Sequence, residues 1–308
     1  MNAPAVSAGV LEVVGGLAGS PLMVGAIQHW KARLQGRRGP SPWQPYRELR
    51  RLWGKTSVDV SGTTAVYRWA PAVIAACAVA AVVIAPVAGS GPNLGFGHDF
   101  IALVGILALA RFAAAASTWD VANGFSLMGA SRDLTVAVFA EVALLLALAV
   151  PAVLSGTTDL AAMIAATAGG GPWSGPALPL GAVAFAVVVE AETGRQPFDN
   201  PDTHLELTMI HEGPLLEYAG RDLAYLQWAA AARHWVLLVL ASELFLPHPH
   251  SAWAQLGLLP VELVLLCAGL ALTETLVAKM RILLAPRLLA VAAAAAVLGV
   301  VARETGVR

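Results

Sequence analysis

Eight long apolar stretches constrain this chain more than any other feature of its sequence. Each has about the length, roughly 20 residues, that a helix needs to cross the hydrocarbon core of a membrane. They lie at approximately 5–28, 65–88, 99–119, 134–154, 176–193, 224–246, 252–277 and 282–302. Only 13% of the 308 residues are charged and 57% are hydrophobic, which does not fit an ordinary soluble domain. We therefore predict an all-α, polytopic membrane protein with about eight transmembrane helices and short amphipathic helices in its cytoplasmic loops.

The distribution of positive charge predicts how the chain is oriented in the membrane. Basic residues crowd the connection after the first apolar stretch, whereas the connections near 89–98, 155–175 and 247–251 contain no Lys or Arg. Cytoplasmic loops carry the excess of Lys and Arg in membrane proteins. We expect cytoplasmic loops at about 29–64, 119–133, 194–223 and 278–282, and both termini on the outer side. No break in composition divides residues 1–308, so we expect a single membrane domain.

Part of the first loop has the pattern of a short helix at the membrane surface. After the helix breakers Gly39 and Pro40, apolar residues recur every three or four positions from Tyr46 to Trp53. Basic residues occupy the other side, a pattern that anchors helices to anionic headgroups. Two interpretations follow: an anchor in the lipid bilayer, or a platform on which a peripheral subunit docks.

A polar segment interrupts the apolar pattern between the fifth and sixth stretches. It runs from Glu192 to Arg221 and combines carboxylates, arginines and several prolines. Irregular backbone at membrane depth is tolerated only where it is buried in protein or lines a water-filled cavity. The segment therefore points to ion or electron chemistry at a membrane surface. We expect Arg195 and Asp199 to hold it in place as an ion pair.

Carboxylates inside the apolar stretches are the strongest functional signal. An ionised group at the centre of a membrane helix costs about 2.5 to 3.5 kcal/mol on insertion scales. The carboxylates in this situation are Glu141, Glu190, Glu192, Glu243, Glu262 and Glu274, and the buried counter-charges available to them are Arg111, Arg233, Arg287 and His234. Structural ion pairs explain any single one, whereas their number favours a proton relay.

We predict a proton path from the carboxylates that lie nearest the polar segment. Glu190 and Glu192 are two residues apart and face opposite sides of a helix. Glu192 is adjacent to the polar segment and is therefore preferred. The predicted path comprises Glu141, Glu192, Glu206, Glu212 and Glu217.

Several other kinds of site find no support in the sequence. Cys77 and Cys267 stand alone within apolar stretches and provide neither zinc nor iron-sulfur ligation. His204 and His211 lack a third ligand and the usual spacing of a helical zinc motif. The formal net charge of −1 and the segregation of charge argue against a nucleic-acid partner. We therefore assign no catalytic residue and no metal site, and we place any redox cofactor in another subunit.

Three separated motifs resemble the membrane subunit that joins the two arms of complex I, known as NADH dehydrogenase subunit 1. Arg195 to Gly220 is similar to the long cytoplasmic loop of that family, and Arg37 to Pro45 is similar to its first loop. Gly129 to Arg132, followed by Glu141, is similar to its third-loop and fourth-helix motif. The resemblance covers nearly the whole chain. It implies that Glu141 lies at the mouth of a proton path.

The string from Thr203 to Glu212 is similar to a particular branch, the corresponding subunit of formate hydrogenlyase and other energy-converting nickel-iron hydrogenases. His204 stands where the quinone-reducing members carry an acidic residue. This resemblance implies a subunit that anchors hydrogenase-type large and small (iron-sulfur) subunits, adjoins antiporter-like membrane subunits, and couples electron transfer to proton or sodium movement. The alternative is the corresponding membrane subunit of an NADH:quinone oxidoreductase, which forms part of the quinone chamber. A secondary transporter and a passive anchor rank below both.

The same resemblance implies where cofactors and partners lie. A nickel-iron centre and iron-sulfur clusters are expected in the partner subunits and none in this chain, and quinone is expected only under the alternative. The location is the plasma (inner) membrane of a prokaryote. The interface with the redox arm is expected to comprise Arg33, Arg37, Arg38, Arg132, Arg195, Asp199, Arg221 and Arg281.

Overall fold

A computed structural model describes residues 3–85, 98–169, 171–200 and 209–306, and every regular element in those ranges is a helix. The α-helices are α1 (Ala3–Leu34), α2 (Gln44–Trp53), α3 (Ala65–Ile84), α4 (Asp99–Val121), α5 (Gly124–Ser155), α6 (Leu160–Thr167), α7 (Ala177–Glu192), α8 (Gly220–Phe245), α9 (Ala252–Leu276) and α10 (Ala285–Glu304). Three short 3-10 helices accompany them: η1 (Gly171–Ser174), η2 (Gly213–Leu215) and η3 (Ile282–Leu284). The predicted all-α fold class is confirmed.

Each apolar stretch of the sequence coincides with one long helix. Among the described residues, α3, α4, α5, α8, α9 and α10 are long and apolar enough to cross a membrane. The fifth stretch forms α7, whose 16 residues fall short of the roughly 20 that a perpendicular span needs. The multi-pass membrane class is therefore confirmed, while the total of eight spans stays a prediction. One short helix, α6, lies in the connection 155–175, where we expected only a loop.

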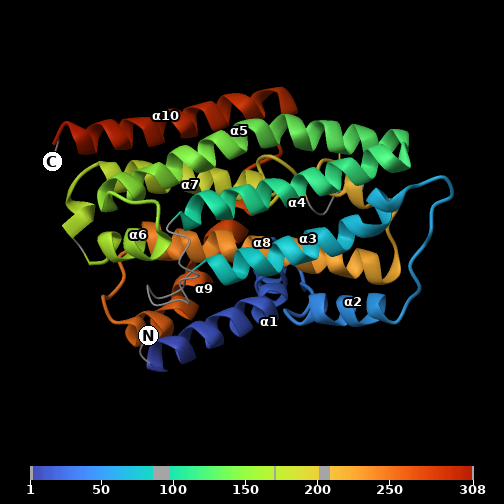
Figure 1. The fold of residues 1–308 in the computed structure, drawn as a ribbon, viewed down its shortest axis with the longest axis horizontal. Coiled ribbons are helices and arrows are strands. Elements are labelled where there is room, and N and C mark those ends of the chain that lie inside the picture. The colour runs from blue at the N-terminus through green and yellow to red at the C-terminus, as the bar shows by residue number, and fades with distance from the viewer. Residues whose placement is uncertain (1–2, 86–97, 170, 201–208, 307–308) are drawn as a thin grey trace.

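The long helices run side by side along the length of the molecule (Figure 1). At one edge α10 packs on α5 and α7, and toward the other edge α1 packs on α8 and α9. Between them α3 packs on α4 and α8, while contacts of α4 with α5 and of α7 with α8 join the two sides. The first helix starts and the last helix ends at the same end of the bundle, which agrees with an even number of crossings.

Small residues allow the helices to approach closely, as is common in membrane bundles. Ala147 of α5, Ala184 of α7 and Ala296 of α10 are completely buried. At Gly299 of α10, a Cβ atom would lie 2.9 Å from the carbonyl oxygen of Ala177 at the start of α7. The backbones of α7 and α10 therefore meet where no side chain stands between them.

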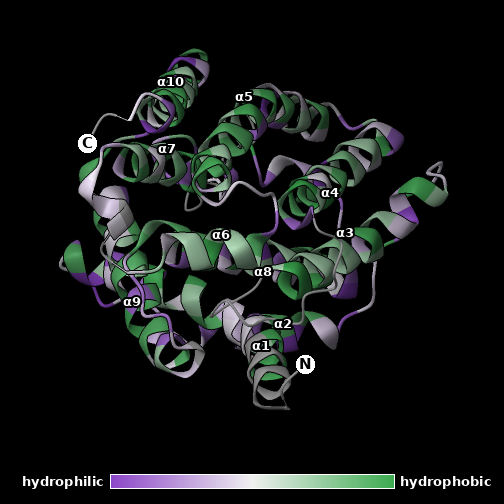
Figure 2. Cartoon of the chain, turned by 60° about the vertical axis from the view of Figure 1, so that its left-hand side comes forward, coloured by the Kyte–Doolittle hydropathy of each residue, from purple (hydrophilic) through white to green (hydrophobic). Residues whose placement is uncertain are grey.

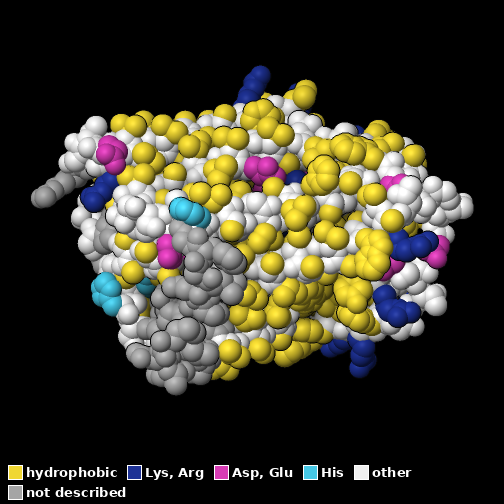
Figure 3. Space-filling view, in the orientation of Figure 1, with side chains coloured by type: hydrophobic (Ala, Val, Ile, Leu, Met, Phe, Trp, Pro, Cys, Tyr) yellow, Lys and Arg dark blue, Asp and Glu magenta, His cyan; other side chains and the backbone are white. Residues whose placement is uncertain are grey.

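Hydrophobic residues predominate along the long helices (Figure 2), and hydrophobic side chains cover much of the face shown in Figure 3. Large hydrophobic side chains point outward, including Phe112, Leu265 and Val291, each more than 60% exposed. Lys and Arg side chains gather toward the end that carries α2 on the face shown in Figure 3, and His side chains lie near the opposite end. A hydrophobic belt between polar ends is the surface that a lipid bilayer covers.

The predicted amphipathic helix is α2, which lies beside the ends of α1 and α8. Its Leu52 is buried, and the ring of Trp53 meets Tyr225 of α8 edge-on at 5.1 Å between centroids. The Tyr46 hydroxyl donates a hydrogen bond to the carbonyl of Ala18 in α1. Since its apolar side packs against the bundle, α2 is held by protein contacts as well as by any contact with lipid.

Candidate functional site: a charged chamber inside the bundle

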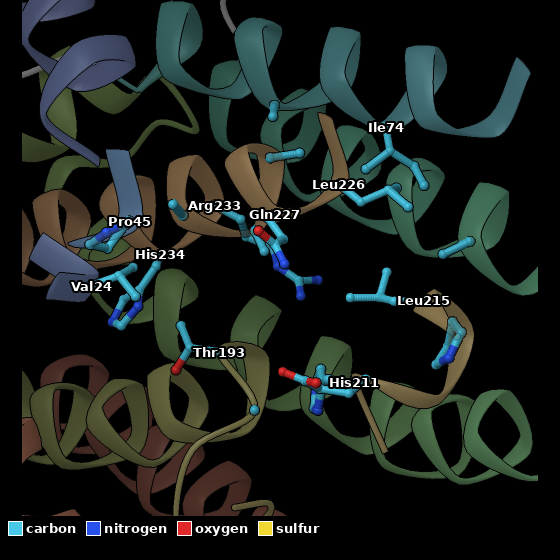
Figure 4. Close-up of a pocket in the computed structure, with 18 of the residues that line it drawn as sticks. Val24, Pro45, Ile74, Thr193, His211, Leu215, Leu226, Gln227, Arg233 and His234 are labelled. Carbon is cyan, nitrogen blue, oxygen red and sulfur yellow. The ribbon is translucent and has the colours of Figure 1, made fainter. Parts of the chain in front are cut away.

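A cavity of about 850 Å³ opens among α1, α2, α3, α4, α8 and the segment that follows α7, and we call it the chamber (Figure 4). Ile74, Leu215 and Leu226 make one part of its wall apolar. Arg233 of α8 and His211 belong to a polar part of the wall. Its volume lies within the roughly 300 to 1,000 Å³ that is typical of ligand sites. The polar segment of the sequence therefore does border a cavity, as its composition predicted.

The end of α7 presents the first residues of the post-α7 segment, residues 193–200, to the chamber. Gly194 has φ of +63°, which ends the helix, and the Arg195 N–H donates to the carbonyl of Glu190 at 2.9 Å. Thr193 caps the helix through its hydroxyl, which donates to the Val189 carbonyl at 2.6 Å. This termination places Glu192 at the last helical position and Arg195 one turn beyond it.

Arg111 of α4 brings two residues of the predicted proton path together. Its guanidinium donates to Glu192 of α7 at 2.7 Å and to Glu141 of α5 at 3.0 Å, and its Nε lies 3.8 Å from the Asp133 carboxylate of α5. The side chains of Arg111 and Glu192 are 5% and 2% exposed, whereas that of Glu141 is 34% exposed. We call these four residues the Arg111 hub. The sequence identified Arg111 as an available counter-charge, and the structure shows which carboxylates it serves.

A second ion cluster lies around Glu274 of α9. Its carboxylate pairs with Lys31 of α1 at 2.9 Å and with the Arg195 guanidinium. The Nδ1 atom of His234 lies 3.5 Å from Arg195 Nη2. Sequence reasoning missed Lys31 because it read that residue as part of the basic cytoplasmic loop, yet Lys31 is 6% exposed.

The predicted ion pair between Arg195 and Asp199 is wrong. Asp199 instead pairs with Lys279 at 2.7 Å, and it accepts backbone hydrogen bonds from Ile210 and His211 at 3.3 Å each. The Asp199 N–H bonds to the Arg195 carbonyl at 3.0 Å, and each side chain of this turn has a nearer partner on another element. Burial by itself would raise the pKa of Asp199, but hydrogen bonds from His211 and Lys279 outweigh it and hold the pKa well below its usual range.

The other predicted path carboxylates fall in different places. Glu212 lines the chamber, whereas Glu217 does not, because its carboxylate accepts a hydrogen bond from Asn123 between α4 and α5 at 2.6 Å. The backbone carbonyl of Glu217 also accepts the Tyr67 hydroxyl at 2.8 Å. Glu206 lies outside the described residues, as does His204. The structure thus joins Glu141 and Glu192 through Arg111, which lines the chamber, as does Glu212.

The predicted interface with a redox arm divides by exposure. Five of its members are exposed, namely Arg33, Arg37, Arg38, Arg221 and Arg281. Arg132 is half-buried and donates to the Met209 carbonyl at 3.4 Å. Arg195 and Asp199 are 6% and 4% exposed, so these two belong to the chamber wall and not to an outer docking surface. Arg195 pairs with the buried Glu274 of α9, and Asp199 pairs with Lys279 in the segment after it.

A separate polar cluster lies between α8 and α9, away from the chamber. Gln255 donates to the carboxylates of Glu243 at 2.8 Å and Glu262 at 3.2 Å, and the Ser242 hydroxyl also donates to Glu262. Such hydrogen bonds are one way in which buried carboxylates are accommodated. Within the described residues, no group of three or more His, Cys, Asp or Glu side chains could hold a metal ion.

The bundle and its charged chamber define a polytopic membrane subunit, and comparison with known proteins gives its family. The family described as NADH dehydrogenase matches residues 8–302, and the chain belongs to this family. A chain of the membrane-bound sulfane sulfur reductase, an archaeal respiratory membrane complex, shares the fold with a TM-score of 0.81 at 21% identity, over 96% of this chain and 97% of that one.

The relatives by sequence point to a branch within the family. Hydrogenase-4 component C of Escherichia coli strain K12 is 34% identical over 248 residues, which cover 80% of this chain and 76% of that protein. Formate hydrogenlyase subunit 4 of the same organism is 33% identical over 279 residues, 87% of this chain and 89% of that protein. An NADH-quinone oxidoreductase subunit of Salinibacter ruber is more distant, at 24% identity over 70% of this chain and 66% of that protein. The predicted resemblance to the hydrogenase branch is confirmed.

Proposed function

We propose that this chain is the membrane-anchoring and ion-coupling subunit of a formate hydrogenlyase-like, energy-converting hydrogenase complex. The observation that carries the coupling role is the Arg111 hub, in which one buried guanidinium at the chamber wall holds Glu141 and Glu192 on two different helices. Support for the hydrogenase branch comes from the higher identity to the hydrogenase and formate hydrogenlyase relatives than to the quinone-reducing one.

Under this proposal the partner subunits carry out the redox reactions. Hydrogenase-type large and small subunits carry the nickel-iron centre and the iron-sulfur clusters, and antiporter-like subunits adjoin the bundle in a prokaryotic plasma membrane. The exposed Arg33, Arg37 and Arg38 at the end of α1 provide a positive surface for the redox arm. With that end in the cytoplasm, both termini lie on the outer side.

Coupling follows from the electrostatics of the chamber. A unit charge about 4 Å from a buried group contributes about 4 kcal/mol at an effective dielectric constant of about 20. A change of charge or geometry at the chamber wall therefore alters how strongly Arg111 holds each carboxylate. The carboxylate that it holds less tightly takes up a proton, and Glu141 is the more exposed of the two at 34%.

The second candidate function is part of the quinone chamber of an NADH:quinone oxidoreductase. The observation that favours it is the apolar part of the chamber wall, formed by Ile74, Leu215 and Leu226. Quinone-dependent electron transfer by the purified complex distinguishes the two candidates, since the hydrogenase assignment expects turnover without added quinone.

The coupling role is tested by Glu141→Gln in the tagged complex, with Glu304→Gln at the exposed end of α10 as a matched control. Mass spectrometry of the purified complex identifies its partners. In proteoliposomes, we expect Glu141→Gln to assemble and turn over while ion translocation per turnover is lost, and the control to behave like the unchanged complex. Undiminished translocation by Glu141→Gln would refute the role of the hub.

A further inference from the structure

We propose that His211 is a protonation-dependent link that joins the post-α7 segment to the Arg111 hub; this inference rests on the proposed coupling function. The imidazole lies between two carboxylates that belong to different elements. Its Nε2 is 3.4 Å from an Asp133 oxygen of α5, and its Nδ1 is 3.6 Å from an Asp199 oxygen of the post-α7 segment. Sequence reasoning had considered His211 only as a metal ligand.

The chemistry of the imidazole makes this position sensitive to a single proton. A neutral histidine has one N–H, so it donates to one carboxylate while its other nitrogen turns a lone pair toward the second. The imidazolium donates to both. Histidine is the side chain whose charge ordinarily changes between about pH 5 and 8. Gain of one proton therefore connects Asp133 and Asp199, and loss of that proton releases one of them.

The backbone fixes the ring in place. Gly194 has φ of +63°, and a Cβ atom there would lie 2.6 Å from His211 Nδ1. The ring therefore lies directly against the turn that ends α7. Glycine is favoured at this position both by its positive φ and by the space that the ring occupies. The side chain keeps 18% of its surface exposed and lines the chamber, so water there can exchange a proton with it.

The two carboxylates extend the link in opposite directions. The other oxygen of Asp133 faces Arg111 Nε at 3.8 Å, and the other oxygen of Asp199 pairs with Lys279 at 2.7 Å. Protonated His211 thus completes a continuous chain from Lys279 to Arg111. Neutral His211 donates to only one of the two carboxylates and so interrupts this chain.

Charged groups on several elements surround the ring. They are Arg111 of α4, Asp133 and Glu141 of α5, Glu192 of α7, Asp199 of the post-α7 segment, Glu212 next to His211 in the chain, Arg233 of α8 and Lys279 after α9. The proton that closes the link comes from chamber water and binds at the imidazole without any movement of electrons.

The test uses the complete complex with His211→Gln, which keeps a donor and an acceptor but does not titrate, and His250→Gln, an exposed histidine at the far end, as control. Ion translocation per turnover is measured in proteoliposomes from pH 6 to pH 8.5. We expect the unchanged complex and His250→Gln to show one titration with at least a twofold change, and His211→Gln to give a flat profile. An unaltered profile in His211→Gln would overturn the inference.

A second measurement reports on the backbone of this subunit and does not depend on ion translocation. Hydrogen-deuterium exchange of peptides that cover 194–200 and 209–217, corrected for intrinsic rates, should show protection that falls with rising pH in the unchanged complex and not in His211→Gln. Asp133→Asn breaks the link from its other end, so its exchange protection should also be independent of pH. This variant replaces His211→Gln in the test if His211→Gln assembles poorly. If Glu141→Gln abolishes coupling while His211→Gln and Asp133→Asn keep the normal pH response, the coupling function is supported and the His211 link is refuted. Should Glu141→Gln couple normally, the proposed function fails, and the exchange data still decide whether the link exists.

Discussion

Replacement of Arg111 by methionine should destabilise the bundle strongly, because it strands a buried carboxylate. Glu192 is 2% exposed at its side chain and receives its only described cationic contact within 4 Å from Arg111. Removal of one partner of a buried ion pair costs about 3 to 5 kcal/mol. Glu141 is about one-third exposed, so loss of its pairing adds less than about 1 kcal/mol. We expect Arg111→Met to lower the free energy of unfolding by about 3 to 5 kcal/mol.

A second substitution separates the stranded charge from a mere loss of packing. Glu192→Gln removes the buried charge, so Arg111→Met combined with Glu192→Gln should be more stable than the sum of the single effects predicts. Groups in direct contact couple by about 0.5 to 3 kcal/mol. The matched control is Arg303→Met, at an exposed arginine of α10, which should change stability by less than about 0.5 kcal/mol.

Unfolding by sodium dodecyl sulfate in mixed micelles, followed by tryptophan fluorescence, measures these free energies on the purified protein. The four proteins of the cycle are compared under one detergent condition. If Arg111→Met stays within about 1 kcal/mol of the unchanged chain, or if Glu192→Gln gives no recovery, the hub is not a buried ion cluster of the kind that incurs this cost.

Two further predictions concern a helix contact and a loop carboxylate. Gly129→Ala in α5 should destabilise the protein, because its Cβ would lie 2.7 Å from the Gly213 Cα. The control is Gly105→Ala, where a Cβ meets nothing within 4 Å, and it should be neutral or stabilise the protein by up to about 1 kcal/mol. Equal effects of the two substitutions in detergent-induced unfolding would contradict the contact. Asp199→Asn should destabilise most near pH 6: the folded pKa of Asp199 is depressed, so its contribution is present above the unfolded value of about 3.9 and is lost as the pH falls below it. A destabilisation that stays constant from pH 6 to pH 3 would show that Asp199 does not contribute through its charge.

The apolar middle of each long helix could be predicted, because length and apolarity mark it in the sequence. The predicted stretch 65–88 became Ala65–Ile84, and 252–277 became Ala252–Leu276. The stretch 134–154 became Gly124–Ser155, because polar residues interrupt the apolar pattern in the first turns of that helix. The short helix α6 escaped prediction because its eight residues are too few to show a pattern. It is stabilised by an N-cap, because the Asp159 carboxylate accepts hydrogen bonds from the N–H groups of Ala161 and Ala162. An Asp residue alone does not predict a helix, so this cap could be recognised only after the helix was known.

The charged residues could be predicted, but their pairing could not. Glu274, Arg195 and Lys31 come from three distant parts of the chain, and only the packing of α1 against α9 brings them together. Spacing along one helix constrains which residues share a face, and it says nothing about which neighbour that face meets. The same limitation explains why Arg195 and Asp199, close in sequence, were paired with each other when each has a partner elsewhere.

The end of α7 is where the two ion clusters become mechanically connected. Glu192 and Arg195 lie one turn apart, yet Glu192 is held by Arg111 of α4 while Arg195 is held by Glu274 of α9. Any displacement of this turn must therefore alter both clusters at once. Lengthening the contact between Arg111 and Glu192 from 2.7 Å by about 1 Å weakens their attraction by about 1.7 kcal/mol at an effective dielectric constant of about 20. That energy corresponds to a change of more than tenfold in a proton-binding equilibrium. A shift of atomic dimensions at this turn therefore changes the proton affinity of the hub by a measurable amount.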